Sequence, residues 1–138
     1  MSQFLKTRIS VMRVGSVVVL LFVGLVAGCG ETGGVNLKVD PDLAKRSLTS
    51  FLETWSRGEK LEALEKANPR IIGRDPLWES GSKLNEYKIG KETSDGANLH
   101  IQVELKVAPE GDASEATTTQ SVTYIVGTSP VITVFRDE

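Results

Sequence analysis

The 138-residue sequence is poor in the residues that build covalent crosslinks and metal sites, with one cysteine and one histidine. A single cysteine cannot form a disulfide within the chain or supply the paired thiolates of a structural zinc site. The sequence also has no His-x-x-His pair, no Asp-x-Asp-x-Asp-Gly calcium loop, no phosphate-binding Gly-rich loop and no nucleophile elbow. It therefore predicts no metal and no cofactor.

The lone histidine, His100, falls on the polar side of an alternating segment, in phase with Gln102, Glu104 and Lys106. A histidine acid–base site needs a carboxylate on a neighbouring strand, facing the same side. The adjacent predicted strand, 117–126, contains no acidic residue. We therefore expect His100 at the surface, and an enzyme is the least favoured of the functions considered below.

The first 28 residues contain no acidic residue. Lys6, Arg8 and Arg13 are basic, and the fifteen residues 14–28 are all apolar or small. An export signal has a basic start and an apolar stretch of about 7–15 residues, whereas a membrane-spanning helix needs roughly 20. The pattern predicts a signal peptide over 1–28, with its basic end kept on the cytoplasmic side.

The cysteine stands at the end of this apolar stretch. Its local sequence resembles a bacterial lipobox, carried by Leu25, Val26, Ala27, Gly28 and Cys29. The resemblance implies a diacylglyceryl thioether on Cys29, cleavage before it, and acylation of the new amine by a fatty acid such as palmitate. Several acyl chains would hold the protein stably on a membrane of the cell envelope. The alternative is an uncleaved anchor with a buried free cysteine.

Gly30, rather than aspartate, follows the lipobox cysteine. In bacteria with two membranes this is similar to lipoproteins that are sent to the outer membrane and face the periplasm. Beyond the signal, 13 basic residues stand against 18 acidic ones, a net charge of −5. This balance argues against nucleic acid or anionic lipid headgroups as partners. Residues 29–40 read as a lipidated, Gly-rich tether, and 41–138 as a single domain.

The domain opens with a predicted helix over about 41–57. Asp40 and Pro41 are typical of a helix start, and Gly58 of its end. One face is apolar, because apolar residues recur at spacings of three and four. These residues are Leu43, Ala44, Leu48, Phe51, Leu52 and Trp55. Polar residues, among them Ser50 and Thr54, are expected on the remaining surface.

After this helix we predict a second helical segment over 59–67 and an irregular stretch over 70–78. Asp75-Pro76 would start a short turn that carries Leu77 and Trp78 into the core. Alternation then predicts strands over 83–89, 98–107, 117–126 and 131–135, separated by turns. Helices followed by three or four consecutive strands indicate an α+β domain with an antiparallel sheet.

The order of these elements, with Trp55-Ser56-Arg57-Gly58 at the end of the long helix, resembles a cystatin-like roll. Domains like nuclear transport factor 2 share this layout over roughly 41–136, and many have a cavity between helix and sheet. The resemblance implies that Phe51, Trp55, Trp78 and Tyr87 would line such a cavity. Some members are enzymes, and many only bind.

The leading interpretation is a non-catalytic lipoprotein of the envelope that serves as an interaction or accessory domain. An envelope protein would contact its exposed sheet face or the loop 108–116. The alternatives are a small-molecule binding domain with a helix–sheet cavity, and an enzyme of the same fold. The remaining charged clusters read as solvated surface: the loop residues Glu110, Asp112 and Glu115, the charged residues 59–66, and Arg70 and Arg74.

Overall fold

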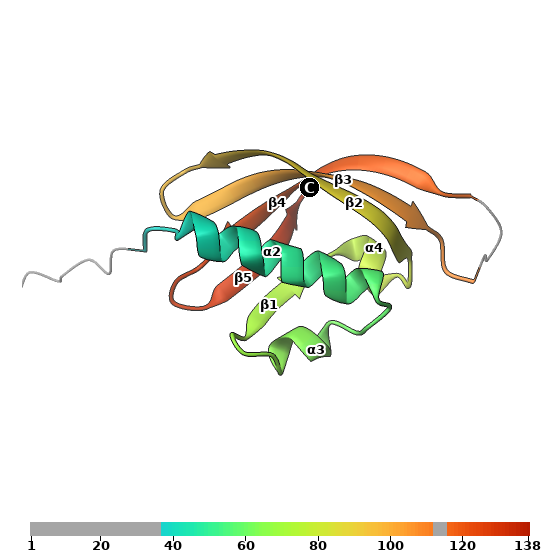
Figure 1. The fold of residues 1–138 in the computed structure, drawn as a ribbon, viewed down its shortest axis with the longest axis horizontal. Helices are drawn as coiled ribbons and strands as arrows, with labels where there is room; N and C mark the ends of the chain where they lie inside the picture. The colour runs from blue at the N-terminus through green and yellow to red at the C-terminus, as the bar shows by residue number, and fades with distance from the viewer. Residues whose placement is uncertain (1–36, 112–115) are drawn as a thin grey trace, which may run out of the picture. The chain divides into compact units, whose positions relative to one another are not determined.

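A curved five-stranded sheet, covered on one face by helices, forms the domain (Figure 1). The computed structural model describes residues 37–111 and 116–138, which belong to one unit over Asn36–Glu138. The predicted signal segment and Cys29 lie outside the described residues, as do Asp112 and Glu115. Within the described part of the chain, no helix has the length and apolar content needed to cross a membrane.

The long helix α2 covers Pro41–Ser56, close to the range that its apolar spacing predicts. Asp40 caps its start, because one carboxylate oxygen accepts hydrogen bonds from the backbone N–H groups of Asp42 and Leu43, both at 3.0 Å. The helix ends two residues before Gly58, whose φ of +74° suits a residue without a side chain. Its buried face includes Ser47 and Thr54 besides the apolar residues. The expectation that Thr54 lies on the exposed polar side is therefore wrong.

Two short helices follow, and one is shorter than expected. α3 covers only Glu62–Glu65 of the predicted 59–67, with Leu64 buried. α4 covers Pro76–Glu79 and is capped by Asp75, so the predicted turn is confirmed. Trp78 is buried and Leu77 is half-buried.

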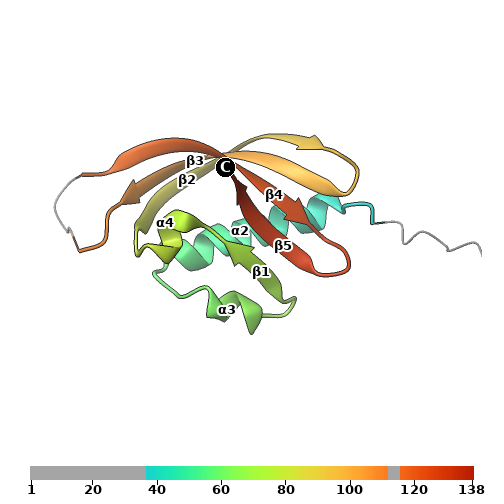
Figure 2. The same cartoon turned by 180° about the vertical axis from the view of Figure 1, so that it is seen from behind.

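The sheet has the order β1-β5-β4-β3-β2. β1 is Ile71–Arg74, β2 Lys83–Ser94, β3 Asn98–Ala108, β4 Thr118–Gly127 and β5 Ile132–Asp137. The four strands β2 to β5 pair antiparallel in sequence order, whereas β1 pairs parallel with β5. Figures 1 and 2 show α2 crossing the concave side of this sheet.

The α+β class is confirmed, but the expected sheet of three or four antiparallel strands is wrong. The stretch 70–78, expected to be irregular, contributes the fifth strand β1. β2 continues to Ser94, through residues expected to form a polar turn. Register shifts near Leu84 and Ile89 bend β2. Its polar half remains paired with β3 as far as Ser94.

Alternating residues of β3 and β4 form the sheet side of the core, and α2 forms the other side. The rings of Phe51 and Tyr124 meet edge to face, with centroids 5.8 Å apart. Gly73 of β1 lies directly under Phe51, where a Cβ atom would come within 2.9 Å of Cδ2. The core thus includes residues from every strand, and it spans Val39 to Val134.

Candidate functional site

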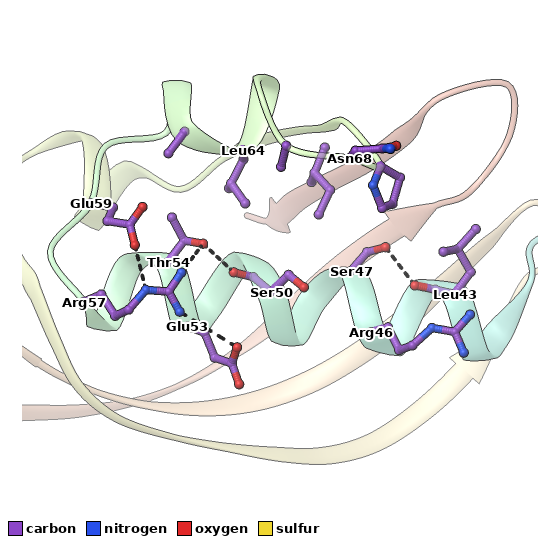
Figure 3. A pocket seen from close by; sticks show the side chains of 14 residues that line it. Leu43, Arg46, Ser47, Ser50, Glu53, Thr54, Arg57, Glu59, Leu64 and Asn68 are labelled. Atoms are coloured by element: carbon purple, nitrogen blue, oxygen red, sulfur yellow. Dashed lines mark hydrogen bonds and ion pairs between the residues drawn. The ribbon is translucent and has the colours of Figure 1, made fainter.

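A groove runs along the side of α2, between this helix and the segment 59–71 (Figure 3). It has a volume of about 560 Å³, within the range of roughly 300–1,000 Å³ that is usual for ligand sites. From Leu43 to Arg57 it follows fourteen helical steps, which corresponds to about 21 Å at ~1.5 Å per residue. An extended chain of about six residues has a similar length, at ~3.3 Å per residue.

The floor of the groove is a row of small hydroxyl residues on α2: Ser47, Ser50 and Thr54. Ser47 Oγ donates to the carbonyl of Leu43, and Thr54 Oγ1 donates to that of Ser50, each at 2.7 Å. Because these two hydroxyl hydrogens are already used, the oxygens can act toward a ligand only as acceptors, and Thr54 Oγ1 already accepts one hydrogen bond, from Arg57 Nη2 at 3.3 Å. A molecule lying here would best present hydrogen-bond donors to the floor.

The opposite wall is apolar and small, because it comes from α3 and the turn that leads into β1. Leu64 is buried beneath it, and Ile71 starts the strand at its far end. The residues on this side are Ala63, Leu64, Ala67, Asn68, Pro69 and Ile71. The small side chains of Ala63 and Ala67 leave the groove open, while Leu64 packs into the core. An apolar ligand group would exchange water for this wall at a gain of about 25 cal/mol per Å² buried.

The two ends of the groove differ in charge. At the C-terminal end of α2, Arg57 Nε donates to Glu59 Oε1 at 2.6 Å, and its Nη1 lies 4.0 Å from Glu53. The hydrogen bond to Glu59 raises the pKa of Arg57. The positive charge of Arg57 is therefore balanced by the carboxylates of Glu59 and Glu53. At the other end, the exposed Arg46 has no acidic partner within 4 Å among the described residues. This end is therefore electropositive.

Three of the aromatic residues expected to line a cavity are packed against each other, although Trp55 and Trp78 also border a second pocket of about 470 Å³ beside the segment 58–62. The rings of Trp55 and Trp78 stack with centroids 5.7 Å apart and planes 6° apart. Phe51 meets Trp78 edge to face at 5.0 Å. Both indole N–H groups are satisfied by carbonyls, Trp55 by Ser82 and Trp78 by Glu59. These three side chains fill the space between helix and sheet, and the half-buried Tyr87 packs at the edge of the core.

His100 lies on the outer face of the sheet, as its strand parity predicts, and is partly exposed. Its Nε2 lies 3.0 Å from Oδ2 of Asp95, in the hairpin turn between β2 and β3. The carboxylate therefore comes from the hairpin turn of the same strand pair, and not from the adjacent strand β4. Hydrogen bonds from His100 and from the backbone of Asn98 lower the pKa of Asp95 to about 2. The pair ties the hairpin turn to β3.

Arg70 and Arg74 are each paired with an acidic residue on the surface. Arg70 lies 3.6 Å from Glu65, and Arg74 Nε donates to Glu79 at 2.9 Å. The hydrogen bond from Arg74 to Glu79 raises the pKa of this arginine. Neither guanidinium is therefore an open anion site. In the part of the chain that the structure describes, no group of three or more His, Cys, Asp or Glu side chains is placed to hold a metal ion.

Sequence reasoning did not identify the groove, although a signal for its floor is present. Ser47, Ser50 and Thr54 recur at spacings of three and four, so they form a stripe of small residues beside the apolar face. Such a stripe leaves room between α2 and the next segment. The comparisons add no relative: no family model, no curated protein and no solved structure matches this chain.

Proposed function

We propose that this chain is a bacterial envelope lipoprotein, anchored by lipid on Cys29, whose domain binds a partner without catalysing a reaction. The basic start, the apolar stretch 14–28 and the run Leu25 to Cys29 support the anchor. Gly30 favours the outer membrane, facing the periplasm, in an organism with two membranes. The role is that of an interaction or accessory domain held near a membrane surface.

The groove along α2 is the observation that carries the binding function. It combines an apolar wall, a floor of acceptor oxygens and an electropositive end, which together fix the position of a ligand. The ionisable side chains that line it are Arg46, Glu53, Arg57 and Glu59, and all four are exposed. General acid–base catalysis depends on groups whose pKa is tuned by burial and neighbours, so this arrangement favours binding over chemistry.

The occupant that best fits the groove is an extended peptide segment of another envelope protein. Its backbone N–H groups would meet the oxygens of Ser47 and Thr54, and its apolar side chains would pack on Ala63 and Ala67. A length of about 21 Å matches about six residues. An acidic side chain at one end would pair with Arg46. This site replaces the sheet face and the loop 108–116 as the proposed contact surface.

A small organic ligand is the second candidate, and the volume of about 560 Å³ favours it. It would occupy this groove and not a cavity between helix and sheet, because Phe51, Trp55 and Trp78 fill that space. We also propose a cystatin-like roll, similar to nuclear transport factor 2, as the fold. The long helix, the turn carrying Trp78 and the curved hairpins support this resemblance.

The anchor is tested by Cys29→Ser in the full chain, expressed in a bacterium that processes lipoproteins. We expect the variant to remain as an unlipidated precursor, detected by mass spectrometry and by loss of labelling with a radioactive fatty acid. Gly33→Ser, in the tether, is the matched control and should be processed normally. Normal processing and membrane retention of the Cys29 variant would refute the anchor.

The groove is tested by placing a photo-crosslinking amino acid at Ala63, on its wall, in the anchored protein. We expect one protein adduct from intact envelopes, which disappears when Ala67→Trp fills the groove. A crosslinker at Lys106, on the outer face of β3, is the control and should not give that adduct. If Ala63 gives no adduct, or the same adducts as Lys106, the groove is not a protein-binding site. Binding of a small molecule that Ala67→Trp abolishes would favour the second candidate.

A further inference from the structure

Three chain segments meet at the end of the domain where the tether enters, and together they are called the tether end below. They are the segment 37–40, the hairpin tip 95–97 and the loop 128–131. Val39 donates its backbone N–H to the carbonyl of Gly96 at 2.9 Å, and Asp40 donates its own to Thr128 Oγ1 at 2.9 Å. These bonds fix both loops beside the first residues of the domain (Figures 1 and 2).

Two large apolar side chains at the tether end are exposed among the described residues. Leu37 is 43% exposed and Val131 is 42% exposed. They are two of the three large hydrophobic residues that are exposed among the described residues, and the third, Phe135, lies on the outer face of the sheet. Ala97 and Pro130, on the same two loops, are also exposed. These side chains make the tether end the part of the described surface best suited to a weak contact with an apolar phase.

Three charged residues belong to the tether end: the exposed Lys38, Asp40 and Asp95, of which the two carboxylates are engaged within the domain. The carboxylate of Asp40 caps α2, and that of Asp95 accepts hydrogen bonds from the backbone of Ala97 and Asn98 and lies against His100. The loop at the opposite end of β3 and β4 is acidic in sequence, since it contains Glu110, Asp112 and Glu115. The large exposed apolar side chains, Leu37 and Val131, thus stand at the tether end, whereas the sequence of the opposite loop is acidic.

We infer that the tether end rests on the lipid bilayer, with Leu37 and Val131 in contact with its interfacial region. This rests on the lipid anchor at Cys29 proposed above. Only residues 30–36 separate Cys29 from Leu37, and seven residues span at most about 25 Å at ~3.6 Å each. Because the anchor holds the domain next to the bilayer, weak apolar contacts suffice to keep the tether end on its surface. α2 then runs away from the membrane, and the electropositive end of the groove lies nearer the lipid.

The test replaces the natural lipid, so that it does not depend on lipoprotein processing. The chain from residue 30 carries an N-terminal histidine tag and is held on phosphatidylcholine vesicles that contain a nickel-chelating lipid. A single cysteine at Val131→Cys is labelled with the environment-sensitive dye NBD. The matched control carries the label at Thr118→Cys, an exposed position at the far end of the sheet. Folding is verified by the near-ultraviolet circular dichroism of the stacked tryptophans.

We expect the label at 131 to shift its emission to the blue and to be quenched by spin-labelled lipids, while the label at 118 stays unchanged. Leu37→Ser should reduce the quenching at 131 at least twofold, whereas Phe135→Ser should not. Equal quenching at both positions, or none at 131, would overturn the inference. So would quenching that needs anionic lipid and survives Leu37→Ser, because the contact would then be electrostatic. These outcomes are independent of Cys29 processing, which tests the anchor separately.

Discussion

The hydroxyl of Tyr124 donates a 2.6 Å hydrogen bond to Oδ2 of Asp75, in the buried centre of the domain. The side chain of Asp75 is fully buried, and its other oxygen accepts from the backbone N–H groups of Leu77 and Trp78. Arg136 places Nη1 3.8 Å from the same carboxylate. One acidic residue therefore joins β4, β5 and the turn that carries Trp78 into the core, and its negative charge is matched.

The first prediction concerns this hydrogen bond. Tyr124→Phe keeps the ring but removes a donor from a buried carboxylate, so we expect a loss of about 1–3 kcal/mol in the free energy of unfolding. Burial raises the pKa of Tyr124 above its ordinary value, so the hydroxyl stays a donor at any pH where the domain is folded. Urea titration followed by tryptophan fluorescence measures the change. Tyr87→Phe, at a half-buried tyrosine on the core edge, is the control and should cost less than 0.5 kcal/mol.

The second prediction concerns the contact between β1 and α2. At Gly73 a Cβ atom would collide with Phe51 Cε2 and lie 3.0 Å from the carbonyl oxygen of Val134. Gly73→Ala should therefore force the ring to move, at a cost of about 1–3 kcal/mol. Gly90→Ala is the matched control, because its nearest neighbour, the carbonyl oxygen of Gln102, lies 3.2 Å away.

The same substitution in a Phe51→Leu background separates crowding from other effects. If the ring is the main obstacle, Gly73→Ala should cost clearly less in that background, because the ring atoms are removed and only the carbonyl oxygen of Val134 remains close. A double-mutant cycle on thermal or urea unfolding measures this difference. Equal costs in both backgrounds would show that the ring is not what excludes a side chain at Gly73.

The elements with regular periodicity were the predictable part of this fold. α2 has an apolar residue at almost every third or fourth position, and β3 alternates over its whole length, so both ranges are nearly those expected. β1 was missed because it has only four residues, one of them Gly73, and pairs with β5 some sixty residues later. Such a parallel pairing depends on distant contacts that leave little trace in the local sequence.

The candidate site was less predictable than the fold, and for a different reason. A cavity between helix and sheet, lined by Phe51, Trp55, Trp78 and Tyr87, belongs to the alternative interpretation as a small-molecule binding domain, because folds of this type often have one. The rings of Phe51, Trp55 and Trp78 fill the space instead, which depends on packing in three dimensions. The groove depends on the path of the segment 59–71, whose helix breaks off after four residues and leaves α2 partly uncovered.

A third prediction concerns pH. The pKa of Asp95 is about 2, below its ordinary 3.8, chiefly because of the hydrogen bond with His100. The group therefore adds stability that is present above pH ~4 and lost as the pH falls from there toward 2. His100→Ala should raise the pKa of Asp95 and move this loss to higher pH. The carboxyl chemical shift of Asp95, followed by NMR, gives the midpoint. Lys106→Ala on the same strand is the control, and an unchanged midpoint in His100→Ala would contradict the prediction.

A fourth prediction concerns the free edge of the sheet. β2 is an edge strand of twelve residues, long enough to pair with another chain, yet it carries Lys88 and Lys91 beside a register shift. Charged residues and bulges on an edge oppose pairing between sheets. Replacing both lysines with isoleucine should therefore produce concentration-dependent self-association, measured by light scattering and sedimentation.

The control for this variant must change charge and hydrophobicity equally, away from any strand edge. Lys60→Ile with Lys66→Ile meets this condition, because both lysines are exposed and flank α3. If the two double variants associate to the same extent, surface hydrophobicity alone explains the result. Association confined to the β2 variant, together with an increase in β structure by infrared spectroscopy, would show that Lys88 and Lys91 keep the edge of this sheet from pairing.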